Sequence, residues 1–258
     1  MRRALIGYSG FVGGALFEAS DFSAGFNSQN IGDIAGQHFD EIICAGIPAV
    51  KWLANKEPER DRNTIGALLA SLETVRADRF VLVSTIDVYP DPSRPLTEDD
   101  EPNGSLNHAY GRHRLDAEAW VTKRFADRLI VRLPALFGPG LKKNVLFDLL
   151  HSNQVNRIDP ASEFQWYPLL RLSADLALAR SAGLQLVNFF TEPLKTQEIL
   201  ERFFPNVHVG APSLKPVVYR LQSRHAAVFG GPPGYVMDRS QVLDGMESFI
   251  TAERNAMA

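Results

Sequence analysis

The sequence predicts an α/β protein with a doubly wound parallel sheet and a smaller C-terminal lobe. Over about the first 136 residues, short apolar runs alternate with segments of helical periodicity, which is typical of an open parallel sheet. The first run, Arg3 to Ile6, leads through closely spaced glycines into a helical segment. A strand that turns through glycines into a helix is a hallmark of this class.

The elements follow in order along the chain. The expected strands are 3–6, 22–26, 42–45, 79–84 and 129–133, and the expected helices begin at Gly14, Asn63 and Tyr110. Only about a dozen residues separate Asn30 from Ile42, too few for a helix and a strand, so this α/β unit is expected to be shortened. A further strand near 184–190 is expected to return to the sheet.

Composition and charge exclude several classes of partner. A net charge of -3 gives no reason to expect nucleic acid or an anionic membrane surface. The chain has no stretch of 18 apolar residues, so no membrane span is expected. The single Cys44 and six scattered histidines suggest neither a disulfide nor a metal site. We therefore expect a cytoplasmic protein that binds no metal. The oligomeric state is left open, with a homodimer as one candidate.

The glycine turn is a candidate phosphate seat. Gly7, Gly10 and Gly13 are spaced three residues apart just before a helix. Backbone N–H groups at a helix start are unpaired, and the helix dipole there favours negative charge. Three glycines alone leave two interpretations open, a dinucleotide site and a structural turn.

A tyrosine and an arginine lie one helical turn apart. Tyr110 and Arg114 share a helix face at this spacing. Lowering a phenol pKa from ~10 by about three units requires roughly 4 kcal/mol, which one cation at ~4 Å supplies at an effective dielectric constant of ~20. The spacing fits an acid/base tyrosine, but spacing alone favours the alternative of a tyrosine beside a solvated arginine.

Several motifs together resemble the extended short-chain dehydrogenases/reductases, the group that includes nucleotide-sugar epimerases and dehydratases. The motifs are Gly7–Gly13 (GYSGFVG), Asn63–Gly66 (NTIG), Val83–Tyr89 (VSTIDVY) and Tyr110–Arg114 (YGRHR), with further agreement at Glu98 and from Arg132 to Gly140. The resemblance covers about residues 3–140 well and the remainder loosely. It implies a Rossmann-type fold and a nicotinamide cofactor, NAD or NADP.

The resemblance also implies roles for particular residues. Tyr110 would be the acid/base, Thr85 the hydroxyl that aligns the reacting oxygen, and Arg114 the source of positive charge. The residues implied to form the cofactor site are Gly7, Ser9, Gly10, Phe11, Val12, Gly13, Asn27, Ser28, Ala45, Gly46, Asn63, Ser84 and Pro134. Residues 1–136, with the return strand, would form the dinucleotide-binding domain, and residues 137–258 a smaller substrate-binding lobe.

The chain departs from the family pattern in four places. Arg114 replaces a lysine that in the family holds the ribose and lowers the tyrosine pKa. Ile86 stands where dehydratases have an acid, which disfavours loss of water. Asn27-Ser28 replaces the acidic residue that grips an NAD ribose, so the pattern leans toward NADP. Ala135 stands where an asparagine often contacts a substrate diphosphate.

The expected function is that of an NAD(P)-dependent oxidoreductase or epimerase. It would act on a hydroxyl or keto group of a small polar substrate, with a nucleotide sugar as one candidate. The alternatives are an NAD(P)-binding sensor or scaffold with little or no catalysis, and a globular protein that binds no dinucleotide.

Overall fold

The computed structural model describes residues 1–257, which fall into two compact units. The first comprises residues 1–91, 100–133 and 172–188, and the second comprises residues 92–99, 134–171 and those from 189 onward. Both units are therefore assembled from separate stretches of the chain.

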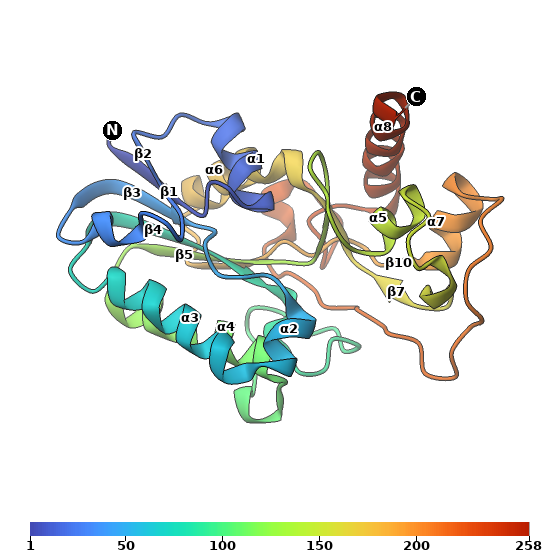
Figure 1. Cartoon of the computed structure of the whole chain (residues 1–258), viewed down its shortest axis with the longest axis horizontal. Coiled ribbons are helices and arrows are strands. Elements are labelled where there is room, and N and C mark those ends of the chain that lie inside the picture. Colours follow the sequence, from blue (N-terminus) through green and yellow to red (C-terminus); the bar gives the residue numbers. More distant parts are fainter. Residues whose placement is uncertain (258) are drawn as a thin grey trace. The chain divides into compact units, whose positions relative to one another are not determined.

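A parallel sheet of six strands forms the centre of the first unit (Figure 1). In spatial order the strands are β2 (Ala24–Phe26), β1 (Arg3–Ile6), β3 (His38–Cys44), β4 (Arg76–Thr85), β5 (Arg128–Leu133) and β9 (Leu186–Asn188). All pairings in this sheet are parallel, and the register places Ile6 beside Cys44 and Thr85 beside Leu133. The predicted fold class is thus confirmed.

Helices cover both faces of this sheet (Figure 1). The helices of the first unit are α1 (Phe11–Ala19), α2 (Lys51–Lys56), α3 (Pro58–Ser71), α4 (Ala109–Arg124) and α6 (Leu172–Ser181). Figure 1 shows α1 and α6 on one face and α3 and α4 on the other. Between β2 and β3 there is only a 3₁₀ turn, Ile31–Ile34, which agrees with the expected shortening of this unit.

The core of the first unit lies between the sheet and the α3–α4 layer. Strand residues such as Ile42, Phe80 and Leu82 are almost fully buried there, together with Leu72 and Val121 from the helix layer. The long apolar run of β4 is explained by this burial, because both faces of a central parallel strand are covered.

The helix that precedes β4 begins earlier than expected. The structure starts α3 at Pro58, whereas the sequence pattern predicted a start at Asn63. Proline is well suited to the first helical position because the N–H that it lacks would be unpaired there anyway. Glu59 and Asp61 in the first turn further stabilise this start through the helix dipole.

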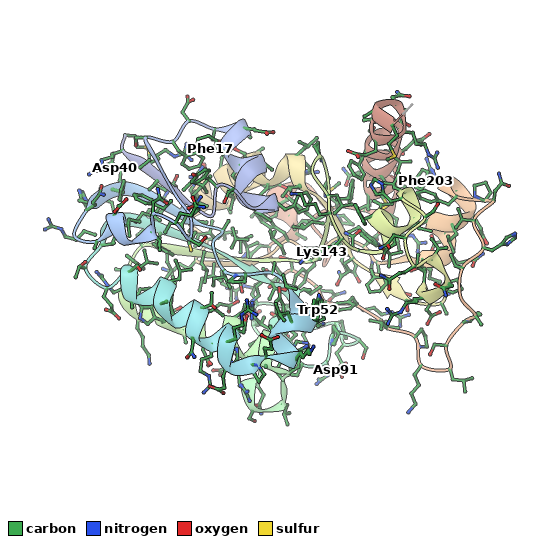
Figure 2. All side chains as sticks on the ribbon, viewed as in Figure 1. Phe17, Asp40, Trp52, Asp91, Lys143 and Phe203 are labelled. Atoms are coloured by element: carbon green, nitrogen blue, oxygen red, sulfur yellow. The ribbon has the colours of Figure 1, made fainter. Side chains whose placement is uncertain are left out.

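The second unit contains two small sheets and three helices. Its elements are β6 (Ala135–Phe137) paired with β8 (Trp166–Pro168), β7 (Glu163–Phe164) paired with β10 (Leu194–Lys195), α5 (Val145–Leu150), α7 (Thr196–Phe203) and α8 (Arg239–Met257). Trp166 and Tyr167 are buried in this unit, as expected of core aromatics. Figure 2 shows the side chains of the described residues in the same view.

Within residues 1–257, no helix combines the length and the apolar character needed to cross a membrane.

Candidate functional site

The order of the strands places a switch point between β1 and β3. From β1 the chain moves outward to β2, and it then returns to the other side of β1 to form β3. The loops that leave β1 and β3 lie against each other, since the N–H of Ala45 donates to the carbonyl oxygen of Ile6 over 2.9 Å. Open α/β sheets bind ligands at the carboxyl ends of the strands beside such a point.

The glycine turn between β1 and α1 is packed too closely for side chains. Gly7 has φ +87°, and a Cβ there would lie 2.6 Å from the carbonyl oxygen of Ala45. A Cβ on Gly13 would lie 1.9 Å from the carbonyl oxygen of Gly7. Gly10 is the N-cap of α1 and is exposed, as is Ser9.

The chemistry of this helix start fits a pyrophosphate group. Because Gly10 has no side chain, it leaves the first N–H groups of α1 uncapped, and Phe11, Val12 and Gly13 bring no negative charge. An anionic ligand can therefore approach the positive end of the helix dipole directly. Ala45 and Gly46, at the end of β3, are half-buried beside Gly7.

Gly13→Ala is expected to abolish dinucleotide binding, because its methyl group would overlap the Gly7 carbonyl and push α1 away from the turn. Gly14→Ala is the matched control. Its Cβ would meet only the carbonyl oxygen of Tyr8 at 3.6 Å, an ordinary contact, and alanine favours the helix. Calorimetric titration of both variants with NAD and NADP checks this prediction. Equal affinity in the two variants would contradict it.

The end of β2 offers neither a carboxylate nor a cation to a ribose. The side chain of Asn27 is used locally: its Oδ1 accepts from the N–H of Gln29 at 2.9 Å, and its Nδ2 donates to the hydroxyl of Tyr8 at 3.2 Å. Ser28 is exposed. These contacts do not discriminate between NAD and NADP.

Thr85 and Tyr110 come together at the carboxyl end of β4. Thr85 is the last residue of β4, Tyr110 lies in the first turn of α4, and the Thr85 side chain is close enough to the Tyr110 phenol to lower its pKa. Gly111 permits this approach, since a Cβ there would lie 2.1 Å from the carbonyl oxygen of Asp87. The helix start is further fixed by the N–H of Gly111, which donates to Nδ1 of His108 at 3.0 Å.

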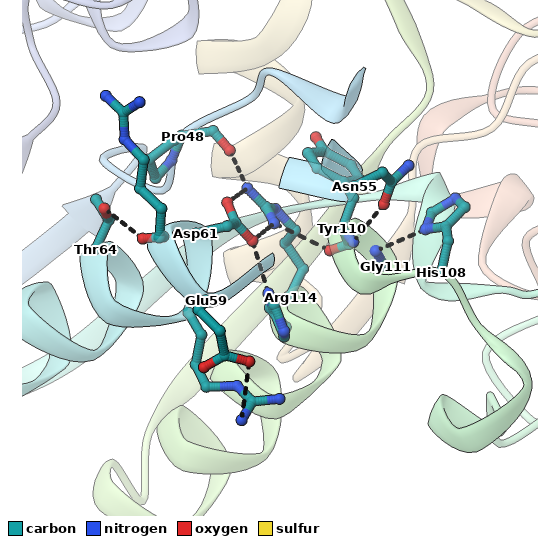
Figure 3. Close-up of polar contacts among 12 residues, drawn as sticks. Pro48, Asn55, Glu59, Asp61, Thr64, His108, Tyr110, Gly111 and Arg114 are labelled. Atoms are coloured by element: carbon teal, nitrogen blue, oxygen red, sulfur yellow. Dashed lines mark hydrogen bonds and ion pairs between the residues drawn. The ribbon is translucent and has the colours of Figure 1, made fainter. Parts of the chain in front are cut away.

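Arg114 lies against the ring of Tyr110, and its four terminal N–H donors are used within the protein (Figure 3). The guanidinium carbon is 3.8 Å from the ring centroid. Nη1 donates to Asp61 at 2.5 Å and to the carbonyl of Tyr110 at 3.1 Å, while Nη2 donates to Asp61 at 2.9 Å and to the carbonyl of Pro48. The fifth donor, Nε, is buried and has no partner among the described residues.

Burial has the largest effect on the pKa of Tyr110. Burial raises the pKa of Tyr110 above its ordinary value, and the charge of Arg114 and the hydrogen bond with Thr85 offset only part of this rise. The carboxylates of Asp87 and Asp61 raise it further. The spacing of Tyr110 and Arg114 suggested a lowered phenol pKa, whereas the pKa in the structure is raised. The reason is that Arg114 acts in a buried site beside its own counter-ion.

Asp61 is a central residue of this cluster that the sequence motifs did not indicate. It accepts from both Nη atoms of Arg114, and Nδ1 of His113 lies 2.8 Å from its Oδ2. Burial alone would raise the pKa of Asp61, but the hydrogen bonds and charges of Arg114 and His113 hold it below its ordinary value. One signal was available, because Asp61 precedes the buried Ile65 by four residues and so lies on the inner face of α3.

Asp87 and Lys51 form a second charged pair in this region. Asp87 follows Thr85 in a 3₁₀ turn, Ile86–Val88, and its N–H donates to Oγ1 of Thr85 at 3.2 Å. Nζ of Lys51, the first residue of α2, lies 2.7 Å from Oδ1 of Asp87. Burial lowers the pKa of His108, and the positive charge of nearby Lys51 lowers it further.

Three of the residues that the family resemblance implied for cofactor binding do not lie at the glycine turn. Asn63 is exposed in the middle of α3. Ser84 is buried, and its hydroxyl donates to Glu118, which also accepts from Arg132. Pro134 follows β5 directly and belongs to the second unit. Whether these three residues contact a ligand stays a prediction.

The fold and this site define a Rossmann-type α/β protein with a glycine turn and a Thr–Tyr hydroxyl pair at the carboxyl edge of the sheet. Comparison with known families agrees with that class. Residues 27–159, about half of the chain, match the NAD dependent epimerase/dehydratase family. The chain therefore belongs to this family. The match begins beyond the glycine turn, and none of the curated proteins compared with the chain matches it.

Solved structures with this fold include sugar-nucleotide enzymes. UDP-glucose 4-epimerase of Thermotoga maritima, solved with UDP-glucose, is 15% identical, with both chains covered over 100% and a TM-score of 0.77. A dTDP-4-dehydrorhamnose reductase of Clostridium acetobutylicum is 15% identical over 98% of this chain and 100% of its own, with a TM-score of 0.75. Another of Bacillus anthracis, solved with NADP, is 17% identical over 97% and 98%, with a TM-score of 0.74.

Proposed function

We propose that this protein is an NAD(P)-dependent oxidoreductase or epimerase that acts on a hydroxyl or keto group of a small polar substrate. Tyr110 serves as the acid/base, Thr85 aligns the reacting oxygen, and Arg114 supplies positive charge behind the Tyr110 ring. The first unit would bind the dinucleotide, and the second would provide substrate contacts.

The hydroxyl pair of Thr85 and Tyr110 is the observation that carries this proposal. Both hydroxyls belong to buried or half-buried residues at the carboxyl edge of a parallel sheet, where such folds bind ligands. Two adjacent hydroxyls can hold one substrate oxygen, with one of them transferring a proton. The nicotinamide, when bound, would accept or supply the hydride.

The raised pKa of Tyr110 favours one direction of proton transfer. A phenol whose pKa lies above its ordinary value is protonated at neutral pH. Tyr110 would therefore act as a general acid that donates its proton to a carbonyl oxygen. In the reverse direction the phenolate must form, and Arg114, with its guanidinium carbon 3.8 Å from the ring centroid, is placed to stabilise it.

Hydride transfer fits the site better than dehydration. Ile86, where dehydratases have an acid, is buried and apolar. The neighbouring carboxylate of Asp87 is bound to Lys51. Neither side chain is set to protonate a leaving hydroxyl group.

A nucleotide sugar is the substrate class that the structural neighbours suggest. UDP-sugar epimerases and dTDP-4-dehydrorhamnose reductases share the fold at low identity, and the reductase of Bacillus anthracis was solved with NADP. Our preference for NADP comes from the missing carboxylate at Asn27-Ser28.

A binding protein with little catalysis is the second candidate. It is favoured by one observation: the four terminal N–H donors of Arg114 are all taken up by the protein.

One experiment separates the enzyme from the binding protein. The protein is titrated with NAD and NADP, and the complex is then incubated with a panel of keto sugars and alcohols. The proposal expects binding and a change in nicotinamide absorbance with at least one substrate class. Binding without any turnover would favour the sensor or scaffold, and absence of binding would exclude both.

A further inference from the structure

Lys51 and Asp87 present a donor and an acceptor side by side next to the Thr85–Tyr110 pair. Nζ of Lys51 and Oδ1 of Asp87 are 2.7 Å apart, and the two side chains are 41% and 15% exposed. Asp87 is tied to the site through its own N–H, which donates to Oγ1 of Thr85. The charged pair thus lies beside the hydroxyls that would handle the reacting oxygen.

The segment that carries Lys51 is fastened to α4 at both ends. Near its start, the carbonyl of Pro48 accepts from Arg114 (Figure 3). Near its end, Oδ1 of Asn55 accepts from the N–H of Tyr110 at 2.9 Å. Lys51 therefore projects from a short helix whose position is set by the same residues that form the site. A side chain on a fixed element can recognise a ligand more precisely than one on a free loop.

Arg114 and Lys51 differ in what they can offer a ligand. The side chain of Arg114 is 2% exposed and its four terminal N–H groups are bound internally. It can act on Tyr110 through its charge, but it presents no terminal donor outward. The ammonium of Lys51 is reachable from solvent and has three donor hydrogens in total.

The chemistry of the Lys51–Asp87 pair suits a neutral hydroxyl. A hydroxyl both donates and accepts, so it can bridge an ammonium and a carboxylate, whereas the carboxylate would repel a phosphate or carboxyl group. We propose that the Lys51–Asp87 pair binds a sugar hydroxyl beside the position where Thr85 and Tyr110 engage the reacting oxygen. This inference rests on the proposed function. The hydroxyl would come from the ribose on the nicotinamide side or from the sugar of the substrate.

Lys51→Met tests this site, with Lys56→Met on the same helix as the matched control. Calorimetry would compare NADP with its adenosine half, which lacks the nicotinamide ribose, and UDP-glucose with UDP. Loss of a charged hydrogen bond predicts an affinity about tenfold or more weaker for one intact ligand, with both halves unchanged. A loss confined to NADP identifies the ribose as the source, and a loss confined to UDP-glucose identifies the substrate sugar.

Asp87→Asn separates hydroxyl recognition from simple attraction of anions. The proposal expects it to weaken the same intact ligand as Lys51→Met does. If Lys51 only attracts phosphates, Lys51→Met would weaken whole and half ligands alike and Asp87→Asn would strengthen them. That result, or unchanged binding in Lys51→Met, would overturn the sugar-hydroxyl site alone. Wild-type protein that binds none of these ligands would overturn the proposed function as well.

Discussion

Replacing Tyr110 with phenylalanine is expected to lower turnover by about 10²–10⁴-fold, the usual contribution of a positioned acid/base. The ring, on which the guanidinium of Arg114 lies at 3.8 Å, is kept in this variant. Only the phenolic hydroxyl, which lies close to Thr85, is lost. Cofactor affinity should therefore stay within a few-fold of the wild type. Turnover numbers on an accepted substrate, measured together with the cofactor Kd, check both parts.

Thr85→Ser is the companion to this variant, because it keeps a hydroxyl at the same position and should retain most of the activity. Full activity in Tyr110→Phe would remove Tyr110 from the mechanism. Loss of cofactor affinity in parallel with turnover would mean that the hydroxyl is needed for binding rather than for proton transfer.

The second large effect is expected at Asp61. Asp61→Asn removes the carboxylate that Arg114 and His113 share, and it leaves a buried guanidinium without its counter-ion. Breaking a buried ion pair in this way typically costs about 3–5 kcal/mol of unfolding free energy. Urea unfolding at neutral pH measures this loss.

Glu59→Gln on the same helix is the matched control, since the Glu59–Arg62 pair is exposed and spans 3.8 Å. Exposed pairs of this kind contribute about 0–1 kcal/mol. Equal stability losses in the two variants would contradict a special role for Asp61.

The pH dependence of stability gives Asp61 an independent signature. Its pKa is lowered in the folded protein by Arg114 and His113, so the unfolded chain takes up the proton first as the pH falls. The stabilisation is thus fully present above the unfolded value of ~3.9 and is lost as the pH drops through the folded pKa. The unfolding free energy of Asp61→Asn should therefore fall less steeply than that of the wild type as the pH is lowered through this range. An equally steep fall in the two proteins would show that other carboxylates cause it.

Much of the fold could be predicted from local patterns. The apolar run that ends at Ser84-Thr85 indicated a buried parallel strand, and β4 is one. The short distance between Asn30 and Ile42 predicted the reduced connection before β3. The long helix α8 was missed, although Val242, Met246, Phe249 and Ile250 are buried at helical spacing. The many polar residues between them hide this helical spacing in the sequence.

The site was only half visible in the sequence. Thr85 and Tyr110 belong to short motifs whose spacing could be read directly, and the structure brings them together. Asp61 on α3 meets Arg114 on α4, and Lys51 on α2 meets Asp87 in the turn that follows β4. Such contacts between separate elements cannot be read from a local sequence motif. The net pKa direction of Tyr110 depends on burial, which spacing does not report.

Transfer of deuterium from labelled NADPH or NADH to a keto sugar is the most direct test of the central claim that this site carries out hydride transfer with Tyr110 as the proton donor. The wild type should yield a sugar whose former carbonyl carbon carries a hydroxyl group and one deuterium, as measured by mass spectrometry. Tyr110→Phe should yield almost none of this product. Wild-type protein that binds the cofactor but transfers no deuterium to any sugar of the panel would contradict the account.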